Sequence, residues 1–184
     1  MRGVGRARQG AAILAAIAVL SACSSGDGDP ATQSPSSSTT PTPSASSSPS
    51  AEAEALAAYR GMWQDMVTAA RTSDYQSPLL ARHATGPALT QIVQSLYRDK
   101  KDGVVTKGEP ILDPEVTETA LDADPPRVIV EDCGDSSKWL KYRVSTGKLK
   151  DNVPGGRRHI AATVVRTEGQ WKVLGIAVSE VGTC

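Results

Sequence analysis

The chain has 184 residues, in which 20 lysines and arginines balance 20 aspartates and glutamates, so its formal net charge at pH 7 is zero. A zero charge sum without a long basic run excludes the electrostatic attraction on which nucleic-acid binding depends, and we expect no nucleic-acid partner. The length allows one ordinary domain plus extensions, and the aromatic residues (three Trp, four Tyr and no Phe) allow only local stacking surfaces.

The first 22 residues have the pattern of an export signal. Three arginines lie within the first eight residues, and an apolar run over residues 11–20 follows them. Ten helical residues rise about 15 Å, half of the roughly 30 Å hydrocarbon core of a bilayer, so this run is too short to span a membrane. Its length and flanks are typical of a signal peptide.

The signal is followed by Leu20-Ser21-Ala22-Cys23, which resembles the lipobox of bacterial lipoproteins at all four positions. By that resemblance the chain is cleaved before Cys23, whose thiol carries a diacylglycerol. Two acyl chains anchor a protein stably, whereas one gives only marginal membrane binding. We therefore expect a lipoprotein-type signal peptide over residues 1–22 and a mature protein on the outer face of the cell membrane. The alternative is an ordinary cleaved signal in which Cys23 carries no lipid.

Residues 23–50 predict a disordered tether behind the lipidated cysteine. From Ser24 to Ser50, 11 Ser, 4 Thr and 5 Pro make up 20 of 27 residues. Such a segment cannot bury enough apolar surface to offset the loss of conformational entropy on folding. Its composition permits O-glycosylation, and an unmodified spacer is the alternative.

Residues 51–184 are expected to form one domain, whose first half has helical periodicity. Ser50 can cap a first helix, and Gly61 in its middle indicates a close approach by another segment. The apolar positions of this helix follow helical spacing. They are Leu56, Tyr59, Trp63, Met66 and Ala70.

Two further helices are predicted by their start and stop signals. Ser77 and Pro78 are typical of the beginning of a short second helix, which Gly86 ends. Pro87 begins a third helix, and Gly103 stops it. The third helix has one apolar stripe and a basic last turn, which suits the negative end of the helix dipole.

The second half of the domain has the composition of β-strands. Segments rich in Val, Ile and Thr and bounded by Gly, Pro and Asp predict strands at 104–106, 115–121, 127–133, 159–166 and 171–178. Glu168-Gly169 predicts a hairpin between the last two. Because both faces of 171–178 carry apolar residues, we expect this strand to be central. The result is an α+β fold, with N-terminal helices packed on one face of a curved antiparallel sheet.

Residues spread over nearly the whole domain resemble those of actinobacterial secreted lipoproteins. They are Tyr59 and Trp63, 84–89, 108–110, Asp132, Cys133 and Asp135, 139–142, 155–158, 171–173 and Cys184. The arrangement is similar to the nuclear transport factor 2-like fold, a cone of curved antiparallel sheet around helices. The resemblance implies an extracytoplasmic location. Because this fold serves isomerases, dehydratases and binding modules, it does not decide the function.

The cysteines point to a disulfide independently of that resemblance. With Cys23 taken by lipid, Cys133 and Cys184 remain as an even pair in an oxidising compartment, and we expect them to be bonded. The chain-entropy model gives such a bridge about 4 kcal/mol of stability. The alternative is two free thiols or a metal-binding thiol, although neither cysteine has a second ligand at metal spacing.

No side chain belongs to a recognisable catalytic motif, and we expect no catalytic residue. His83 and His159 are interpreted as solvated or structural. Isomerases of this fold need a carboxylate facing a tyrosine inside the cone. The imaginable groups here are Asp65, Asp74, Tyr59 and Tyr97, of which the two aspartates are interpreted as solvated surface residues.

The acidic residues around Cys133 are Glu131, Asp132 and Asp135. Calcium needs six or more oxygen ligands, so a turn with capping carboxylates is the better interpretation. We expect neither a metal nor a cofactor.

A candidate ligand patch lies in the polar, weakly patterned segment before the last two strands. Trp139 and Tyr142 are an aromatic pair in a predicted loop, where recognition and packing across the sheet mouth are equally plausible. Arg157 and Arg158 could hold an anion, and a charged strand edge that prevents aggregation is the alternative.

The lipobox, the tether, the disulfide and the missing catalytic grouping together predict a lipid-anchored, extracytoplasmic, non-enzymatic binding or assembly module. Its expected partners are the membrane and an unidentified cell-envelope protein or small molecule, and a homodimer through the open sheet face is a further hypothesis. The rival is a small enzyme of the isomerase or dehydratase type with a pocket in the cone. A buried acid facing a tyrosine inside a cavity of roughly 300 Å³ or more favours the enzyme, whereas a filled cone excludes it.

Overall fold

The computed structural model describes residues 50–184. The predicted signal peptide, the lipidation site Cys23 and the predicted tether up to residue 49 lie outside the described residues. Within residues 50–184, no helix is long and apolar enough to cross a membrane.

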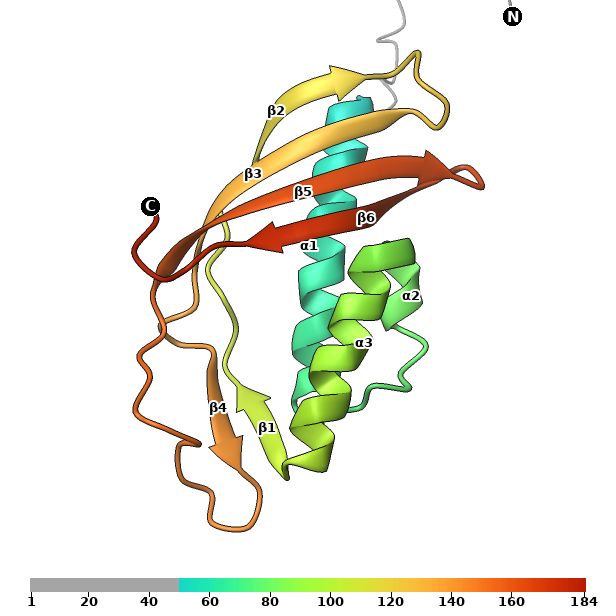
Figure 1. The fold of residues 1–184 in the computed structure, drawn as a ribbon. Coiled ribbons are helices and arrows are strands. Elements are labelled where there is room, and N and C mark those ends of the chain that lie inside the picture. Colours follow the sequence, from blue (N-terminus) through green and yellow to red (C-terminus); the bar gives the residue numbers. More distant parts are fainter. Residues whose placement is uncertain (1–49) are drawn as a thin grey trace, which may run out of the picture. The chain divides into compact units, whose positions relative to one another are not determined.

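The described residues have the predicted α+β architecture, with the helices before an antiparallel sheet (Figure 1). The helices are α1 (Ala51–Ala70), α2 (Leu80–His83) and α3 (Gly86–Lys101), and the strands are β1 (Val104–Lys107), β2 (Glu115–Ala120), β3 (Arg127–Asp135), β4 (Leu140–Arg143), β5 (Arg157–Thr167) and β6 (Gln170–Val178). This order is compatible with a nuclear transport factor 2-like cone.

Helix α1 begins where its capping signal predicts. The Ser50 side chain accepts a hydrogen bond from the Ala53 backbone N–H at 3.2 Å, which satisfies one of the free donors of the first turn. Glu52 and Glu54 in the same turn face the positive end of the helix dipole. The local sequence therefore fixes the start of this helix.

Helix α2 is shorter than predicted, and the prediction of its ends was wrong. It begins at Leu80 without a side-chain cap rather than at Pro78, and it ends before Ala84 rather than at Gly86. The reason is tertiary: Ala84 has an extended backbone that forms a parallel bridge with Val173, and the Thr85 N–H donates to the Val173 carbonyl. The connection between α2 and α3 thus extends the sheet by one bridge.

The strands form a four-stranded sheet in the order β2-β3-β5-β6 and a separate antiparallel ribbon of β1 and β4. Strand β4 was not predicted, because its four residues carry two basic side chains and no β-branched one. The hairpin between β5 and β6 was predicted: Glu168 and Gly169 both have positive φ, as a tight two-residue turn requires.

Strand β6 is an edge strand, so the prediction that it is central was wrong. Its edge is covered by the bridge at Ala84 and by helix α3 (Figure 1). The pairing with β5 also skips Leu174, which forms a bulge opposite Thr163 and Val164. Because a bulge changes which side chains face inward, Ile176 faces the helices along with Val173.

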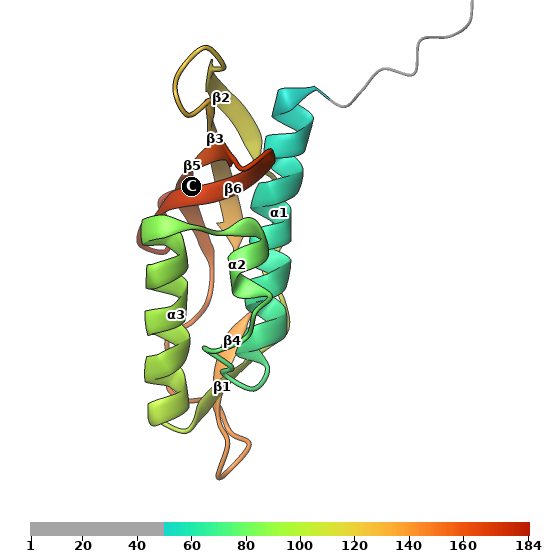
Figure 2. The ribbon, with the colours of Figure 1, turned by 90° about the vertical axis from the view of Figure 1, so that its right-hand side faces the viewer.

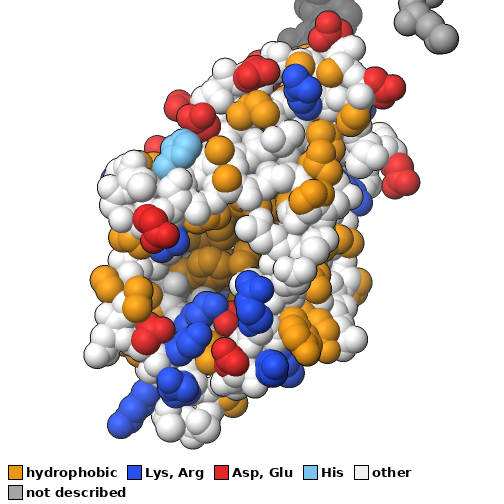
Figure 3. All heavy atoms as spheres, viewed as in Figure 1, with side chains coloured by type: hydrophobic (Ala, Val, Ile, Leu, Met, Phe, Trp, Pro, Cys, Tyr) orange, Lys and Arg blue, Asp and Glu red, His pale blue; other side chains and the backbone are white. Residues whose placement is uncertain are grey.

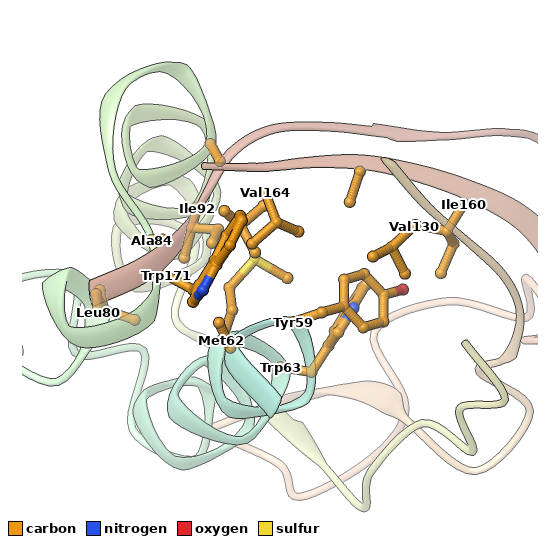
Figure 4. Close-up of a cluster of buried hydrophobic side chains, with 14 of the residues drawn as sticks. Tyr59, Met62, Trp63, Leu80, Ala84, Ile92, Val130, Ile160, Val164 and Trp171 are labelled. Atoms are coloured by element: carbon orange, nitrogen blue, oxygen red, sulfur yellow. The ribbon is translucent and has the colours of Figure 1, made fainter. Parts of the chain in front are cut away.

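The core lies between the inner face of the sheet and the helices. Tyr59 and Trp63 extend from α1 toward the side of the sheet that carries Val130 and Ile160, and Met62 extends toward Val164 (Figure 4). In Figure 2, α2 lies between α1 and α3. The opposite face of the sheet carries mostly half-buried side chains, and the homodimer through it stays a prediction.

Gly61 is the point where α2 approaches α1, as its position predicts. A Cβ atom at Gly61 would lie 2.8 Å from the His83 ring. The ring's Nδ1 lies 2.7 Å from the Asp65 carboxylate, one turn further along α1. The absence of a side chain at Gly61 therefore lets His83 reach a buried carboxylate.

Cys133 and Cys184 form the predicted disulfide, with their Cα atoms 5.9 Å apart. The bond joins the chain end to β3 across a sequence separation of 51 residues. Close by, the Gly182 N–H donates to the Arg157 carbonyl, so the last residues are held to the sheet by a hydrogen bond as well.

We predict that Gly61→Ala destabilises the protein, although alanine favours helices by about 1 kcal/mol over glycine. The added methyl displaces His83 and strains its hydrogen bond to Asp65, for an expected net loss of about 1–3 kcal/mol in the free energy of unfolding. Denaturant unfolding measures this loss. In a His83→Ala background the same substitution should raise stability, and destabilisation in both backgrounds would disprove the close approach.

Candidate functional site

A cavity of about 380 Å³ opens between the helices and the mouth of the sheet. Figure 3 shows it as a hollow with an apolar floor and lysine and arginine side chains along one edge. Its lining comes from α1 (Met62, Trp63, Met66), α3 (Gln91, Ile92, Ser95, Arg98), the inner face of the sheet (Gly134, Arg158, Ile160, Ile176, Val178), strand β4 (Lys141) and the segments flanking the ribbon (Pro110, Ser136, Trp139).

The cavity exists because the side chains at this end of the sheet do not fill the concave face. Strand β3 turns Val128, Val130 and Asp132 inward, and the next inward position is Gly134, which has no side chain. A Cβ atom there would lie 2.7 Å from the end of the Ile160 side chain, so Ile160 occupies the space directly beside Gly134. The remaining space is of the size that small-molecule sites occupy.

The charged residues that line the cavity are all basic: Arg98, Lys141 and Arg158, with no aspartate or glutamate. Lys141 is already paired, because its Nζ lies 2.6 Å from the carboxylate of the buried Asp99 on α3. This pair joins β4 to α3 at the rim. The basic charge that remains without a partner in the lining therefore belongs to Arg98 and Arg158.

Three buried N–H donors of the lining make no hydrogen bond to any described residue: Trp63 Nε1, Trp139 Nε1 and Arg158 Nε. A buried donor without a partner costs about 1–3 kcal/mol, and such groups are rare in folded proteins. The rings of Trp63 and Tyr59 meet edge to face, with centroids 6.4 Å apart. Trp63 and Trp139 meet edge to face, with ring centroids 5.7 Å apart.

The structure brings together two of the four residues of the predicted ligand patch. Trp139 and Arg158 line the cavity. Tyr142 does not: its ring lies under the ammonium group of Lys107, 4.8 Å from the ring centroid. Arg157 is exposed, and its Nε donates to the sulfur of Cys133. Adjacent residues of a strand point to opposite faces, so only one arginine of the pair can face the cavity.

A buried acid does face a tyrosine, but not in the cavity. The Tyr59 hydroxyl donates to Asp132 Oδ2 at 2.9 Å, and the Asp113 backbone N–H donates to the other carboxylate oxygen at 2.9 Å. Neither Tyr59 nor Asp132 lines the cavity. Burial raises the pKa of Tyr59 above its ordinary value of 10.0, and the charge of Asp132 raises it further. The pair is therefore a structural hydrogen bond between α1 and β3.

The interpretation of Asp65 as a solvated residue was wrong. Asp65 is buried, with its carboxylate 2.7 Å from His83 Nδ1 and 3.8 Å from Arg82. Its burial was not visible in the sequence, because α2 covers a second side of α1 in addition to the sheet. His83 also lines a shallow groove beside the β5–β6 hairpin, together with Trp171, whose indole N–H donates to Glu54.

The other candidate groups lie outside the cavity lining. Asp74 is exposed and accepts a hydrogen bond from the Gln76 N–H, and Tyr97 is a half-exposed ring that meets Tyr75 edge to face. His159 lies 3.5 Å from Glu131 on the other face of the sheet. Among residues 50–184, no three His, Cys, Asp or Glu side chains are grouped closely enough to hold a metal ion.

The acidic residues near Cys133 belong to a strand rather than to the predicted turn. Asp132 alternates with Val128 and Val130, and this period of two could have placed it on the inward face. Only Asp135 behaves as a capping residue, since it accepts a hydrogen bond from the Ser137 N–H, which lowers the pKa of its carboxyl. Lys141 had no such signal, because its partner Asp99 is 42 residues away.

The chain matches no protein-family model. It also matches no curated protein. Among solved structures, it is similar to the intermembrane space region of the chloroplast protein ARC6, with 16% sequence identity and a TM-score of 0.49 over 67% of this chain and 95% of that chain. This likeness is too distant to carry a function from one protein to the other.

We predict that Tyr59→Phe lowers the free energy of unfolding by about 1–3 kcal/mol at pH 7, because Asp132 loses a buried donor. The stability that depends on a protonated Tyr59 is present in full below its unfolded pKa of 10.0 and is lost as the pH rises above it. The difference between wild type and variant should therefore shrink above pH 10 by about 1.4 kcal/mol per pH unit. Denaturant unfolding from pH 7 to 11.5 measures it, with Tyr97→Phe as the control, and a constant difference would refute the assignment.

Proposed function

We propose that the protein is a lipid-anchored, extracytoplasmic module that binds a small molecule in the cavity between α1, α3 and the mouth of the sheet. The observation that carries the proposal is a cavity of about 380 Å³ whose lining holds buried N–H donors without partners. A ligand with acceptor atoms would supply the missing hydrogen bonds. Binding would then offset the free-energy cost of leaving these buried donors without hydrogen bonds in the ligand-free protein.

The proposed location rests on the disulfide and on the N-terminal sequence. The Cys133–Cys184 bond indicates an oxidising environment, which is found outside the cytoplasm. The lipobox resemblance at Cys23 and the Ser/Thr/Pro-rich segment behind it support a lipid anchor with a spacer. The resemblance to actinobacterial secreted lipoproteins agrees with both.

A small enzyme of the isomerase or dehydratase type is the second candidate, favoured by the buried Asp132–Tyr59 pair beside an open cavity. General acid–base catalysis requires both groups within hydrogen-bond reach of the substrate. Neither group lines the cavity, and both oxygens of Asp132 are occupied by donors of the protein. The lining instead offers basic and indole N–H donors, so binding is the better supported function.

Occupation of the cavity can be tested with Nile red, a neutral dye that fluoresces in apolar surroundings. We expect the full chain to enhance its fluorescence, and Ser95→Trp, which adds a large ring to the lining, to abolish the enhancement. The control is Gln94→Trp on the adjacent, exposed position of α3, outside the lining. Equal fluorescence with both variants would mean that the dye binds elsewhere and would contradict a ligand cavity.

The anchor has its own test. Intact-mass analysis of protein extracted from membranes should show a chain that begins at Cys23 and carries a diacylglycerol adduct. Cys23→Ser should move the protein out of the membrane fraction while the Cys133–Cys184 disulfide still forms. A membrane-extracted product without the adduct would remove the lipid anchor from the proposal.

A further inference from the structure

We propose that the ligand of this cavity is an amphipathic monoanion, with a carboxylate held at Arg158 and Trp139 and an apolar body against the helices and β6. This inference rests on the proposed function and deepens it. It follows from the arrangement of charge, donors and apolar side chains in one lining.

The charge of the ligand follows from the basic residues of the lining. No acidic side chain lines the cavity, and Lys141 is neutralised by Asp99. Arg98 is exposed on α3, where water screens its charge. Arg158 is different, because its Nε is buried without a partner. Arg158 as a whole is half-buried, and a single cation whose Nε is withdrawn from water and has no anionic partner calls for one negative charge rather than two.

The head group follows from the donor types. A guanidinium presents its N–H groups in a planar fork that matches the two oxygens of a carboxylate. The indole N–H of Trp139 can only donate, so it also needs an acceptor. Trp63 Nε1 is a third donor of this kind in the lining. Groups that only donate suit a ligand group that has several acceptor sites and no hydrogen to donate, and a carboxylate is such a group.

The body of the ligand follows from the rest of the lining, which is mainly apolar. Met62, Met66, Ile92, Ile176 and Val178 come from α1, α3 and β6. Methionine side chains adapt to ligand chains of different shape. The transfer of each methylene group from water to an apolar site is favourable by about 0.8 kcal/mol. An alkyl or similarly apolar chain with a carboxylate at one end matches a lining that has donors at one end and apolar side chains over the rest.

The test compares decanoate with decanol, which share the chain and differ in the charge of the head. All proteins are mature chains of residues 23–184 with Cys23→Ser, so that neither the signal peptide nor an attached acyl chain competes for the cavity. Binding is measured by isothermal titration calorimetry and by tryptophan fluorescence, because Trp63 and Trp139 line the cavity. We expect decanoate to bind at least about tenfold more tightly than decanol, as a charge-assisted hydrogen bond predicts.

Matched variants locate the head group. Arg158→Leu should reduce decanoate binding to the level of decanol, whereas Arg157→Leu removes the same charge from the exposed face of the same strand and should leave binding unchanged. Trp139→Phe keeps the ring against Trp63 but removes the N–H, and should weaken decanoate several-fold more than decanol. Thermal unfolding of each variant checks that it is folded.

The outcomes separate this inference from the proposed function. If decanol binds as tightly as decanoate, or if Arg157→Leu weakens decanoate as much as Arg158→Leu, the monoanion inference fails while a binding cavity stands. If decyl phosphate, which carries a second charge, binds more tightly than decanoate, the carboxylate assignment fails. If none of the three ligands binds and Nile red fluorescence is not enhanced, the proposed function fails with it.

Discussion

Helix α1 lies against the concave face of the sheet, and the other features of the domain depend on how far it fills that face. Tyr59 and Met62 are almost fully buried, and they fill the space over Val130 and the middle of β5. Toward the other end of the sheet β3 presents Gly134, which has no side chain, and the side chains of Met66, Ile176 and Val178 line an open space without filling it. Core and cavity are thus two parts of the interface between α1 and the sheet. Side chains fill the first part at close packing and leave the second part open.

The rim of the cavity is held by interactions between segments that are distant in the sequence. The Lys141–Asp99 ion pair fixes β4 to α3, and the Ser73 hydroxyl donates to the Val104 carbonyl at the start of β1. These contacts place the β1–β4 ribbon against the helices at one side of the opening. The Cys133–Cys184 disulfide holds the chain end on the outer face of the same sheet. The opening is therefore framed by fixed elements, which suits a preformed site.

The buried donors without partners are what distinguishes the proposed binding site from an apolar packing defect. An apolar cavity lowers the stability of the folded protein in proportion to its volume, but its lining does not select for a ligand with hydrogen-bond acceptors. Trp63 Nε1, Trp139 Nε1 and Arg158 Nε differ from apolar lining atoms, because each is a buried donor whose lost hydrogen bond to water only an acceptor can replace. The Asp132–Tyr59 and Asp65–His83 pairs show the opposite arrangement, since in both the buried polar groups satisfy each other.

The sequence by itself determined the features that depend on neighbouring residues. The cap at Ser50, the turn at Glu168-Gly169 and the order of helices before strands follow from local chemistry and periodicity, and the disulfide followed from counting cysteines. The tertiary structure alone decided that β6 is an edge strand, that Asp65 is buried, and that Arg158 rather than Arg157 faces the cavity. The edge position of β6 and the burial of Asp65 depend on which distant parts of the chain pack against them. Which arginine faces inward depends on the register of β5, which its neighbouring strands fix. Local sequence spacing contains neither kind of information.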